Sequence, residues 1–117
     1  MDIRITTDTH TLTGTLDDTA AARDFAALLP LALTLSDFNA TEKVADLPSR
    51  LNTDGSPKAA AARAGDIAYY APWGNLAIFY RDFPRSPGLV ILGHINGPLD
   101  ALTHGDGEPT VTIEETP

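Results

Sequence analysis

The sequence predicts a single, mostly β domain (α+β) in which about seven or eight short strands close into a barrel, with two short helices. The chain has 117 residues, of which 43% are hydrophobic, and this suits one domain over residues 1–117 with its own core. Several stretches alternate apolar and polar residues with period two, which is typical of half-buried strands. Two later stretches are apolar on both faces, as expected of strands that are covered on both sides.

Two strands are predicted at the N-terminus, in residues 1–6 and 10–16. Ile3 and Ile5 alternate with polar residues in the first stretch, and leucine and glycine alternate with threonine in the second. A tight turn near 8–9 would join them. We therefore expect a hairpin with one buried apolar face and one solvated, threonine-rich face.

A helix is predicted from about Ala20 to Leu29, where the apolar spacing changes from two to three and four residues. Asp17, Asp18 and Thr19 precede it and can cap its free N–H groups. Pro30 should end it, because proline cannot continue a helix. We expect this helix to cover one opening of the barrel, with Phe25 and Leu29 facing inward. A strand with alternating leucines should follow the proline.

The middle of the chain gives mixed signals. Residues 41–47 are compatible with one helical turn ended by Pro48, and residues 52–58 contain turn-forming pairs. Residues 59–62 could form a little helix or remain irregular. The second half holds the remaining predicted elements: strands over 66–70, 76–80 and 89–95, a turn at 71–74, a loop at 81–88, a short helix at 98–103 and a closing strand at 110–114.

Composition excludes several classes of partner and chemistry. Sixteen acidic residues against eight basic ones give a net charge of −8, so no nucleic acid partner is expected, because phosphate binding needs clustered Lys and Arg. The absence of cysteine excludes disulfides and thiolate metal sites. The longest apolar stretch, 25–35, is far shorter than the ~20 residues of a membrane span. With no signal peptide in the sequence, we expect a cytoplasmic protein without membrane association.

No cofactor and no metal site is expected either. The three histidines, His10, His94 and His104, are far apart in the sequence, and none stands four residues from another. His94 follows a predicted buried strand and is the one of the three best placed to face a cavity.

The run from Gly65 to Tyr80, GDIAYYAPWGNLAIFY, resembles the signature of a small bacterial and archaeal cyclophilin-like family. The order and spacing of further segments agree with that family over nearly the whole chain: Leu29-Pro30-Leu31, Thr41-Glu42-Lys43-Val44 followed by Leu47-Pro48, Gly88-Leu89-Val90 with Leu92-Gly93, and Thr110-Val111-Thr112-Ile113-Glu114. The resemblance implies a cyclophilin-like β-barrel. It brings no settled activity, because this family is largely uncharacterised.

Peptidyl-prolyl cis-trans isomerase activity is an alternative that the fold suggests. Cyclophilin isomerases carry an Arg, a Phe-Met pair and a Gln, whereas this chain has no Gln and its only Met is Met1. No catalytic position can therefore be carried over, and fold alone does not transfer function. Arg63, Arg81 and Asn75 are the possible donors to a substrate amide, and we expect no isomerase activity above background.

Five aromatic residues between Tyr69 and Tyr80 are the most informative feature for function. Trp73 occupies a predicted turn, where it either caps the barrel end or walls a ligand groove with its N–H as a polar group. We predict the second arrangement, in which Trp73 and Tyr70 wall a groove at the barrel mouth. The residues expected near its rim are Asn75, Glu42 and Lys43.

The predicted function is binding of a peptide segment or small ligand at this aromatic barrel mouth. Lys43, in an otherwise acidic protein, would bind an anionic group such as a peptide carboxylate. A further alternative is a structural or homo-oligomeric partner protein, which a large exposed apolar patch would favour. The sequence names no catalytic residue and leaves the oligomeric state open.

Overall fold

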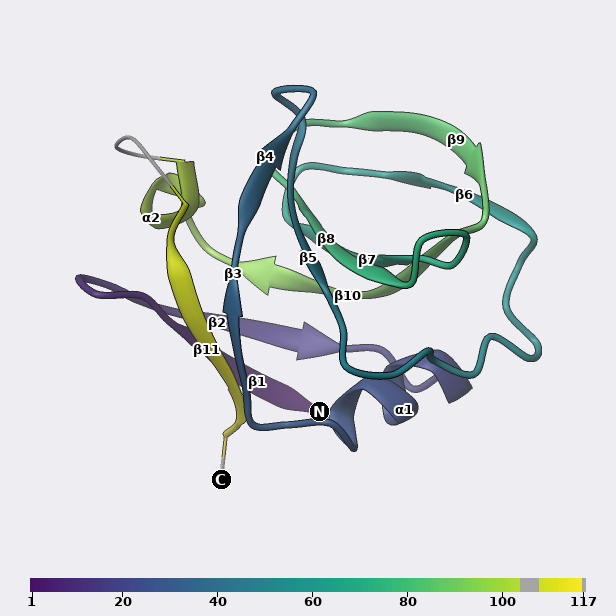
Figure 1. The fold of residues 1–117 in the computed structure, drawn as a ribbon, viewed down its shortest axis with the longest axis horizontal. Helices are drawn as coiled ribbons and strands as arrows, with labels where there is room; N and C mark the ends of the chain where they lie inside the picture. The colour runs from purple at the N-terminus through teal and green to yellow at the C-terminus, as the bar shows by residue number, and fades with distance from the viewer. Residues whose placement is uncertain (104–107, 117) are drawn as a thin grey trace.

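A computed structural model of the chain describes residues 1–103 and 108–116. It confirms a mostly β barrel, with nine rather than seven or eight strands in the main sheet and two more in a small second sheet. The elements in chain order (Figure 1) are β1 (Asp2–Thr6), β2 (Thr11–Leu16), α1 (Ala20–Ala26), β3 (Leu31–Thr34), β4 (Ser36–Phe38), β5 (Glu42–Asp46), β6 (Ala59–Ala62), β7 (Asp66–Tyr70), β8 (Asn75–Phe79), β9 (Phe83–Pro87), β10 (Leu89–Asn96), α2 (Asp100–Thr103) and β11 (Thr110–Glu115).

The main sheet is nearly closed by a single bent segment of the chain. Its strand order is β3-β11-β1-β2-β10-β7-β8-β5-β4, and its neighbouring strands are antiparallel. β3 and β4 stand at opposite ends of this order, yet only Leu35 separates them in the chain. The first half of the segment therefore pairs with β11 and the second half with β5, which brings the two edges of the sheet together.

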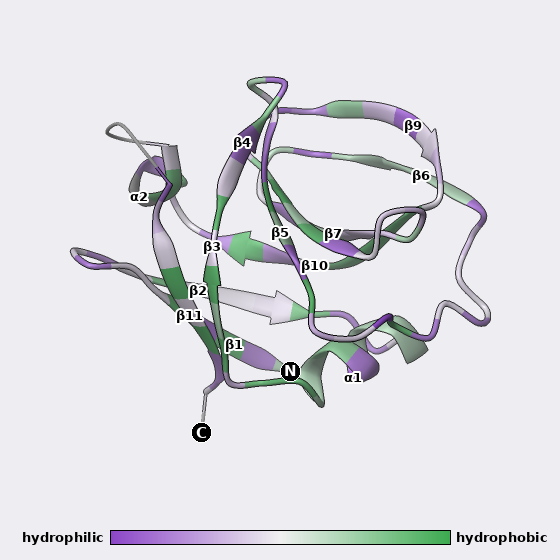
Figure 2. Ribbon diagram, viewed as in Figure 1, coloured by the Kyte–Doolittle hydropathy of each residue, from purple (hydrophilic) through white to green (hydrophobic). Residues whose placement is uncertain are grey.

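The barrel interior is a continuous apolar core that both helices help to cover. The predicted N-terminal hairpin is confirmed, with Ile3 opposite Gly14 and Ile5 opposite Leu12, and both isoleucines are fully buried. Apolar and polar segments alternate along the strands that wall the barrel (Figure 2). Phe25 of α1 and Leu102 of α2 are buried in the same core.

Helix α1 starts as predicted but ends three residues earlier. The Thr19 hydroxyl accepts a hydrogen bond of 3.1 Å from the Ala22 amide, which is an N-cap. The helix stops at Ala26, because the residue before a proline is disfavoured in the α conformation and the last turn tightens. The Ala27 amide still bonds four residues back to the Arg23 carbonyl, whereas the amides of Leu28 and Leu29 bond to carbonyls three residues back. Leu29 is half-buried against the core, whereas Phe25 is fully buried.

Three predictions for the middle of the chain are wrong. Residues 41–47 do not form a helical turn but contain β5, which pairs with β8 on one side and β4 on the other. The possible little helix at 59–62 is β6, and the predicted loop at 81–88 contains β9. Pairing with distant strands overrides the local propensity of these segments, and that pairing cannot be detected within a single window of sequence.

The two-stranded sheet β6–β9 forms a second layer outside the barrel (Figure 1). Because side chains alternate along a strand, β8 directs Leu76 and Ile78 into the barrel core, whereas Ala77 and Phe79 pack in a separate cluster on the outer face. That cluster also includes Ala62 of β6 and partly buried residues of β9 and β10. The strands that are apolar on both faces are thus covered on both sides, as the sequence predicts.

No helix in residues 1–103 and 108–116 is long and apolar enough to cross a membrane. His104, one of the three histidines weighed for a metal site, lies outside the described residues.

Candidate functional site

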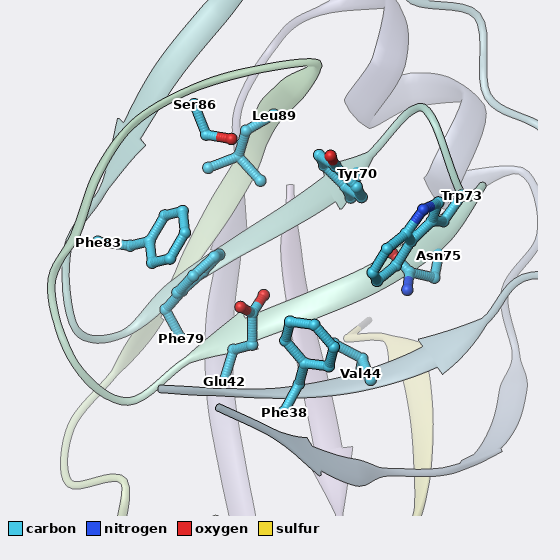
Figure 3. A pocket seen from close by; sticks show the side chains of 10 residues that line it. All are labelled: Phe38, Glu42, Val44, Tyr70, Trp73, Asn75, Phe79, Phe83, Ser86 and Leu89. Atoms are coloured by element: carbon cyan, nitrogen blue, oxygen red, sulfur yellow. The ribbon is translucent and has the colours of Figure 1, made fainter. Parts of the chain in front are cut away.

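A small aromatic pocket lies on the outer flank of the barrel, between the main sheet and β9 (Figure 3). Its volume is about 120 Å³. Strands β4, β5, β7, β8, β9 and β10 and the turn after β7 contribute its lining, which consists of Phe38, Glu42, Val44, Tyr70, Trp73, Asn75, Phe79, Phe83, Ser86 and Leu89. The chain has four Phe, three Tyr and one Trp, so five of its aromatic side chains gather around this pocket.

Strand alternation places these aromatic rings on the outer face. Tyr70 and Phe79 are on the outward faces of β7 and β8, while the alternate residues Tyr69 and Ile78 belong to the barrel core. Phe83 of β9 packs against Phe79, with ring centroids 5.4 Å apart and an angle of 38° between the rings. The pocket is thus bounded by the barrel wall on one side and by β9 of the two-stranded sheet on the other.

Trp73 forms the rim of the pocket. It lies in a tight turn in which the amides of Trp73 and Gly74 donate to the Tyr70 carbonyl at 3.2 and 2.9 Å. Its indole meets the rings of Phe38 and Tyr70 edge-to-face, with centroids 5.5 and 5.2 Å apart, a favourable aromatic arrangement. The side chain is still 57% exposed, so a large apolar surface faces solvent at the pocket entrance.

The turn that carries Trp73 is held by a close contact with a glycine. Gly88 has a φ of +83°, and a Cβ built on it would lie 2.7 Å from Cδ of Pro72. A side chain at this position would therefore be strained and would push the turn away. Only glycine lets the β9–β10 connection approach the turn this closely.

Glu42 presents a carboxylate to the pocket from β5. The residue is 8% exposed, and in Figure 3 its carboxyl group points into the space between the aromatic rings. Among the described residues it has no hydrogen-bond or ion-pair partner. Burial raises the pKa of the Glu42 carboxyl above its ordinary value, and the negative charge of Asp37 adds to the increase.

Asn75 supplies a second acceptor to the same pocket. It is 6% exposed, and its Oδ1 is buried without a hydrogen-bond partner in the described part of the chain. A buried acceptor without a partner costs ~1–3 kcal/mol, and most buried polar groups in proteins are paired. The pocket thus combines apolar walls with two acceptors that the described residues leave unpaired.

The structure does not place Lys43 at the pocket. Because β5 is a strand, Lys43 points to the face opposite that of Glu42, and it stands across from Ile78 and Asp37 in the register. Its Nζ lies 3.6 Å from Asp37 Oδ1, and its side chain is 11% exposed. Lys43, which was expected to bind an anionic group, therefore pairs with Asp37 instead.

Asp37 gathers a second polar cluster on this opposite face. The Tyr80 hydroxyl donates a hydrogen bond to Asp37, and this bond, with Lys43 nearby, lowers the pKa of the Asp37 carboxyl. Burial and the same Asp37 carboxylate raise the pKa of Tyr80 to about 12. The cluster is thus internally paired, in contrast to the two acceptors of the pocket.

Four of the five predicted site residues, namely Glu42, Tyr70, Trp73 and Asn75, line one pocket. Two points differ from the sequence prediction: Lys43 lies elsewhere, and the pocket is on the barrel flank instead of the barrel mouth. Phe38, Phe83 and Ser86 were missed, because β4 and β9 gave no strand pattern of their own.

A second hollow, of about 470 Å³, lies between the start of α1 and residues 54–57. It is larger than the aromatic pocket and is lined partly by charged, polar side chains. The buried unpaired side-chain atoms found among the described residues are Asn75 Oδ1 and Thr116 Oγ1, and neither residue lines this hollow. The aromatic pocket is therefore the better candidate site.

The comparisons with known proteins agree with this architecture. A family model described as "Cyclophilin-like family" matches residues 5–114. The chain belongs to the cyclophilin-like family. The solution structure of the hypothetical protein AF2241 from Archaeoglobus fulgidus is similar to this cyclophilin-like domain, with a TM-score of 0.74 at 18% identity over 99% of this chain and 95% of that one. That likeness supports the fold alone, and the comparison with curated proteins finds no match.

The possible isomerase donors of this cyclophilin-like domain are separated by the structure. Arg63 and Arg81 are exposed and do not line the aromatic pocket, whereas Asn75 does. No arginine or lysine is among the described residues that line the pocket. In residues 1–103 and 108–116, no group of three or more His, Cys, Asp or Glu is placed to hold a metal ion.

Proposed function

We propose that this cyclophilin-like domain binds a peptide segment or a small ligand in the aromatic pocket on the barrel flank. The observation that carries this proposal is the convergence of five aromatic side chains and two unpaired acceptors on one small pocket. Apolar walls with a few placed polar groups are the usual composition of ligand sites. The exposed Trp73 at the entrance would lose its solvent contact when a ligand covers it.

The size of the pocket limits the bound group. Sites for whole drug-sized ligands measure ~300–1,000 Å³, and an engineered cavity of ~150 Å³ binds benzene. A pocket of about 120 Å³ therefore suits one compact group, such as the end of a side chain or the head of a small molecule. The rest of the ligand would lie across Trp73 at the surface.

Two observations favour binding over the alternatives. Isomerase chemistry calls for a donor above the substrate amide; of the three possible donors, Arg63 and Arg81 do not line the pocket, and Asn75 does. Self-association would be favoured by an exposed apolar flank, but the large apolar side chains found exposed among the described residues are Met1 and Trp73. A single exposed tryptophan beside a pocket is better explained as part of a binding site.

A pocket-filling substitution tests this proposal. Ser86 lines the pocket from β9, so Ser86→Phe should fill the space, whereas the matched Ser86→Ala leaves it open. A fragment library and a set of short peptides would be screened by backbone amide NMR. We expect hits whose shifts centre on the pocket, retained in Ser86→Ala and lost in Ser86→Phe. Hits that centre elsewhere, or that survive Ser86→Phe, would contradict the proposal.

A further inference from the structure

We propose that the group bound in the aromatic pocket is an organic cation, specifically an alkylated ammonium head; this inference rests on the proposed binding function. The pocket joins the three features that recognise such a group, namely aromatic faces, a nearby carboxylate and restricted volume. The inferred ligand is therefore cationic, whereas Lys43 suggested an anionic ligand from the sequence.

The aromatic walls are suited to a cation. A cation within ~6 Å of a ring centroid is attracted by the electron-rich face of that ring, and quaternary ammonium groups are commonly held in aromatic cages. Trp73 is in edge-to-face contact with Phe38 and with Tyr70, with centroids 5.5 and 5.2 Å apart. Edge-to-face packing sets neighbouring rings at a steep angle, so the walls turn toward more than one side of the enclosed space (Figure 3).

Two acceptors in the pocket are left unpaired. The Glu42 carboxylate points among the rings without a partner in the described residues, and Asn75 Oδ1 is likewise unpaired. The lysine next in sequence to Glu42 faces the other way and pairs with Asp37, so it does not neutralise Glu42 from within the pocket. A cationic ligand would supply the missing countercharge, and the net charge of −8 would favour its approach.

An alkylated ammonium fits better than a bare one. A bare ammonium brings three N–H donors that all require acceptors, whereas most of the pocket lining is apolar. Alkyl groups remove that requirement and pack directly on the rings. The volume of about 120 Å³ also matches a compact head group. The same head occurs on free small molecules and on methylated lysine side chains of peptides, and the experiment separates these two sources.

The test compares choline with its neutral isostere 3,3-dimethylbutan-1-ol and with ethanolamine, which lacks the methyl groups. Trp73 is the only tryptophan, so its fluorescence reports binding at the pocket. We expect choline to bind at least about tenfold more tightly than either control. A short peptide carrying trimethyllysine, compared with its unmodified form, shows whether the head is better accepted on a peptide. Tighter binding of either choline or the modified peptide than of its controls supports the inference.

Glu42→Gln should remove the preference for choline over its isostere, whereas Glu115→Gln, at an exposed site on β11, should retain it with the same change in net charge. Equal binding of choline and isostere to the wild-type protein would overturn the cation inference and leave ligand binding intact. Absence of binding by every probe would overturn the inference as well, while the Ser86 variants decide the binding function independently.

A folding defect in Glu42→Gln would not prevent a decision. Choline-induced shifts of the Trp73 indole and Asn75 side-chain N–H signals can be followed in the wild-type protein. Shifts that centre on these groups support the inference. Shifts confined to other parts of the chain would overturn it.

Discussion

Replacement of Trp73 by alanine separates a structural tryptophan from a ligand-binding one. The side chain is 57% exposed, so less than half of its surface contributes to the stability of the fold. A fully buried aromatic ring removes up to ~250 Å² from water, so this tryptophan removes roughly 100 Å², worth ~2.5 kcal/mol at ~25 cal/mol per Å². This is an upper estimate, because the unfolded chain also hides surface. We expect a loss of ~1–2 kcal/mol in the free energy of unfolding, below the ~3–5 kcal/mol typical of a buried aromatic residue.

Thermal and urea unfolding, followed by circular dichroism, would measure this loss. Phe25→Ala is the matched comparison, because Phe25 is fully buried in the barrel core and should lose ~3–5 kcal/mol. Calorimetry should show that Trp73→Ala weakens binding of choline or of a screened ligand by ~2 kcal/mol, as for an aromatic anchor. A stability loss as large as that of Phe25→Ala, or unchanged binding, would refute the assignment of Trp73 to a ligand site.

Two further predictions concern the close packing of β10 and the acid in the pocket. Gly93→Ala should lower the free energy of unfolding by ~3 kcal/mol or more, because a Cβ there would lie 2.1 Å from the Thr15 carbonyl oxygen of β2. Gly55→Ala, at a φ of +79° with open space around the added Cβ, should cost only ~1 kcal/mol. Equal urea midpoints for the two variants would contradict this prediction. Glu42→Gln should be more stable than the wild type, by a difference in free energy of unfolding that grows as pH rises. The folded-state pKa of Glu42 is raised above its ordinary value by burial, so the wild type loses stability as pH rises from the ordinary pKa through the folded one. The variant lacks this loss and keeps the Asp37 cluster. Urea unfolding between pH 4 and 8 should show a growing advantage of the variant, and a constant or reversed difference would disprove it.

The barrel itself could be predicted from sequence, because its strands carry their burial pattern locally. Ile3 and Ile5 alternate with polar neighbours, and the strand containing Leu76 and Ile78 is apolar on both faces. The latter pattern required cover on two sides, and the structure supplies it with the barrel core inside and the β6–β9 layer outside. A helix cap among Asp17, Asp18 and Thr19 was similarly visible, because a capping bond depends only on residues three positions apart, and Thr19 forms it.

The site could be predicted only in part. Tyr70, Trp73 and Asn75 come from one contiguous segment, so their proximity follows from the turn that joins β7 and β8. The side to which Glu42 and Lys43 point depends on whether their segment is helix or strand, because a one-residue change of register exchanges the two faces. Interpreting 41–47 as a helical turn removed that information. Phe83 lies on a strand that contains prolines and pairs with four alanines, so no local signal indicated it.

The position of β11 between β1 and β3 has a consequence for how the chain acquires this fold. The strand nearest the C-terminus is inserted between two strands from the first third of the sequence, with Val111 opposite Leu33 and Ile113 opposite Ile5. Contacts of such long sequence separation form slowly, because loop closure must precede them. Until residues 110–115 have left the ribosome, β1 and β3 each present an unpaired edge that can associate with other chains. The edges of β1 and β3 therefore stay open to misassociation until β11 has paired with them.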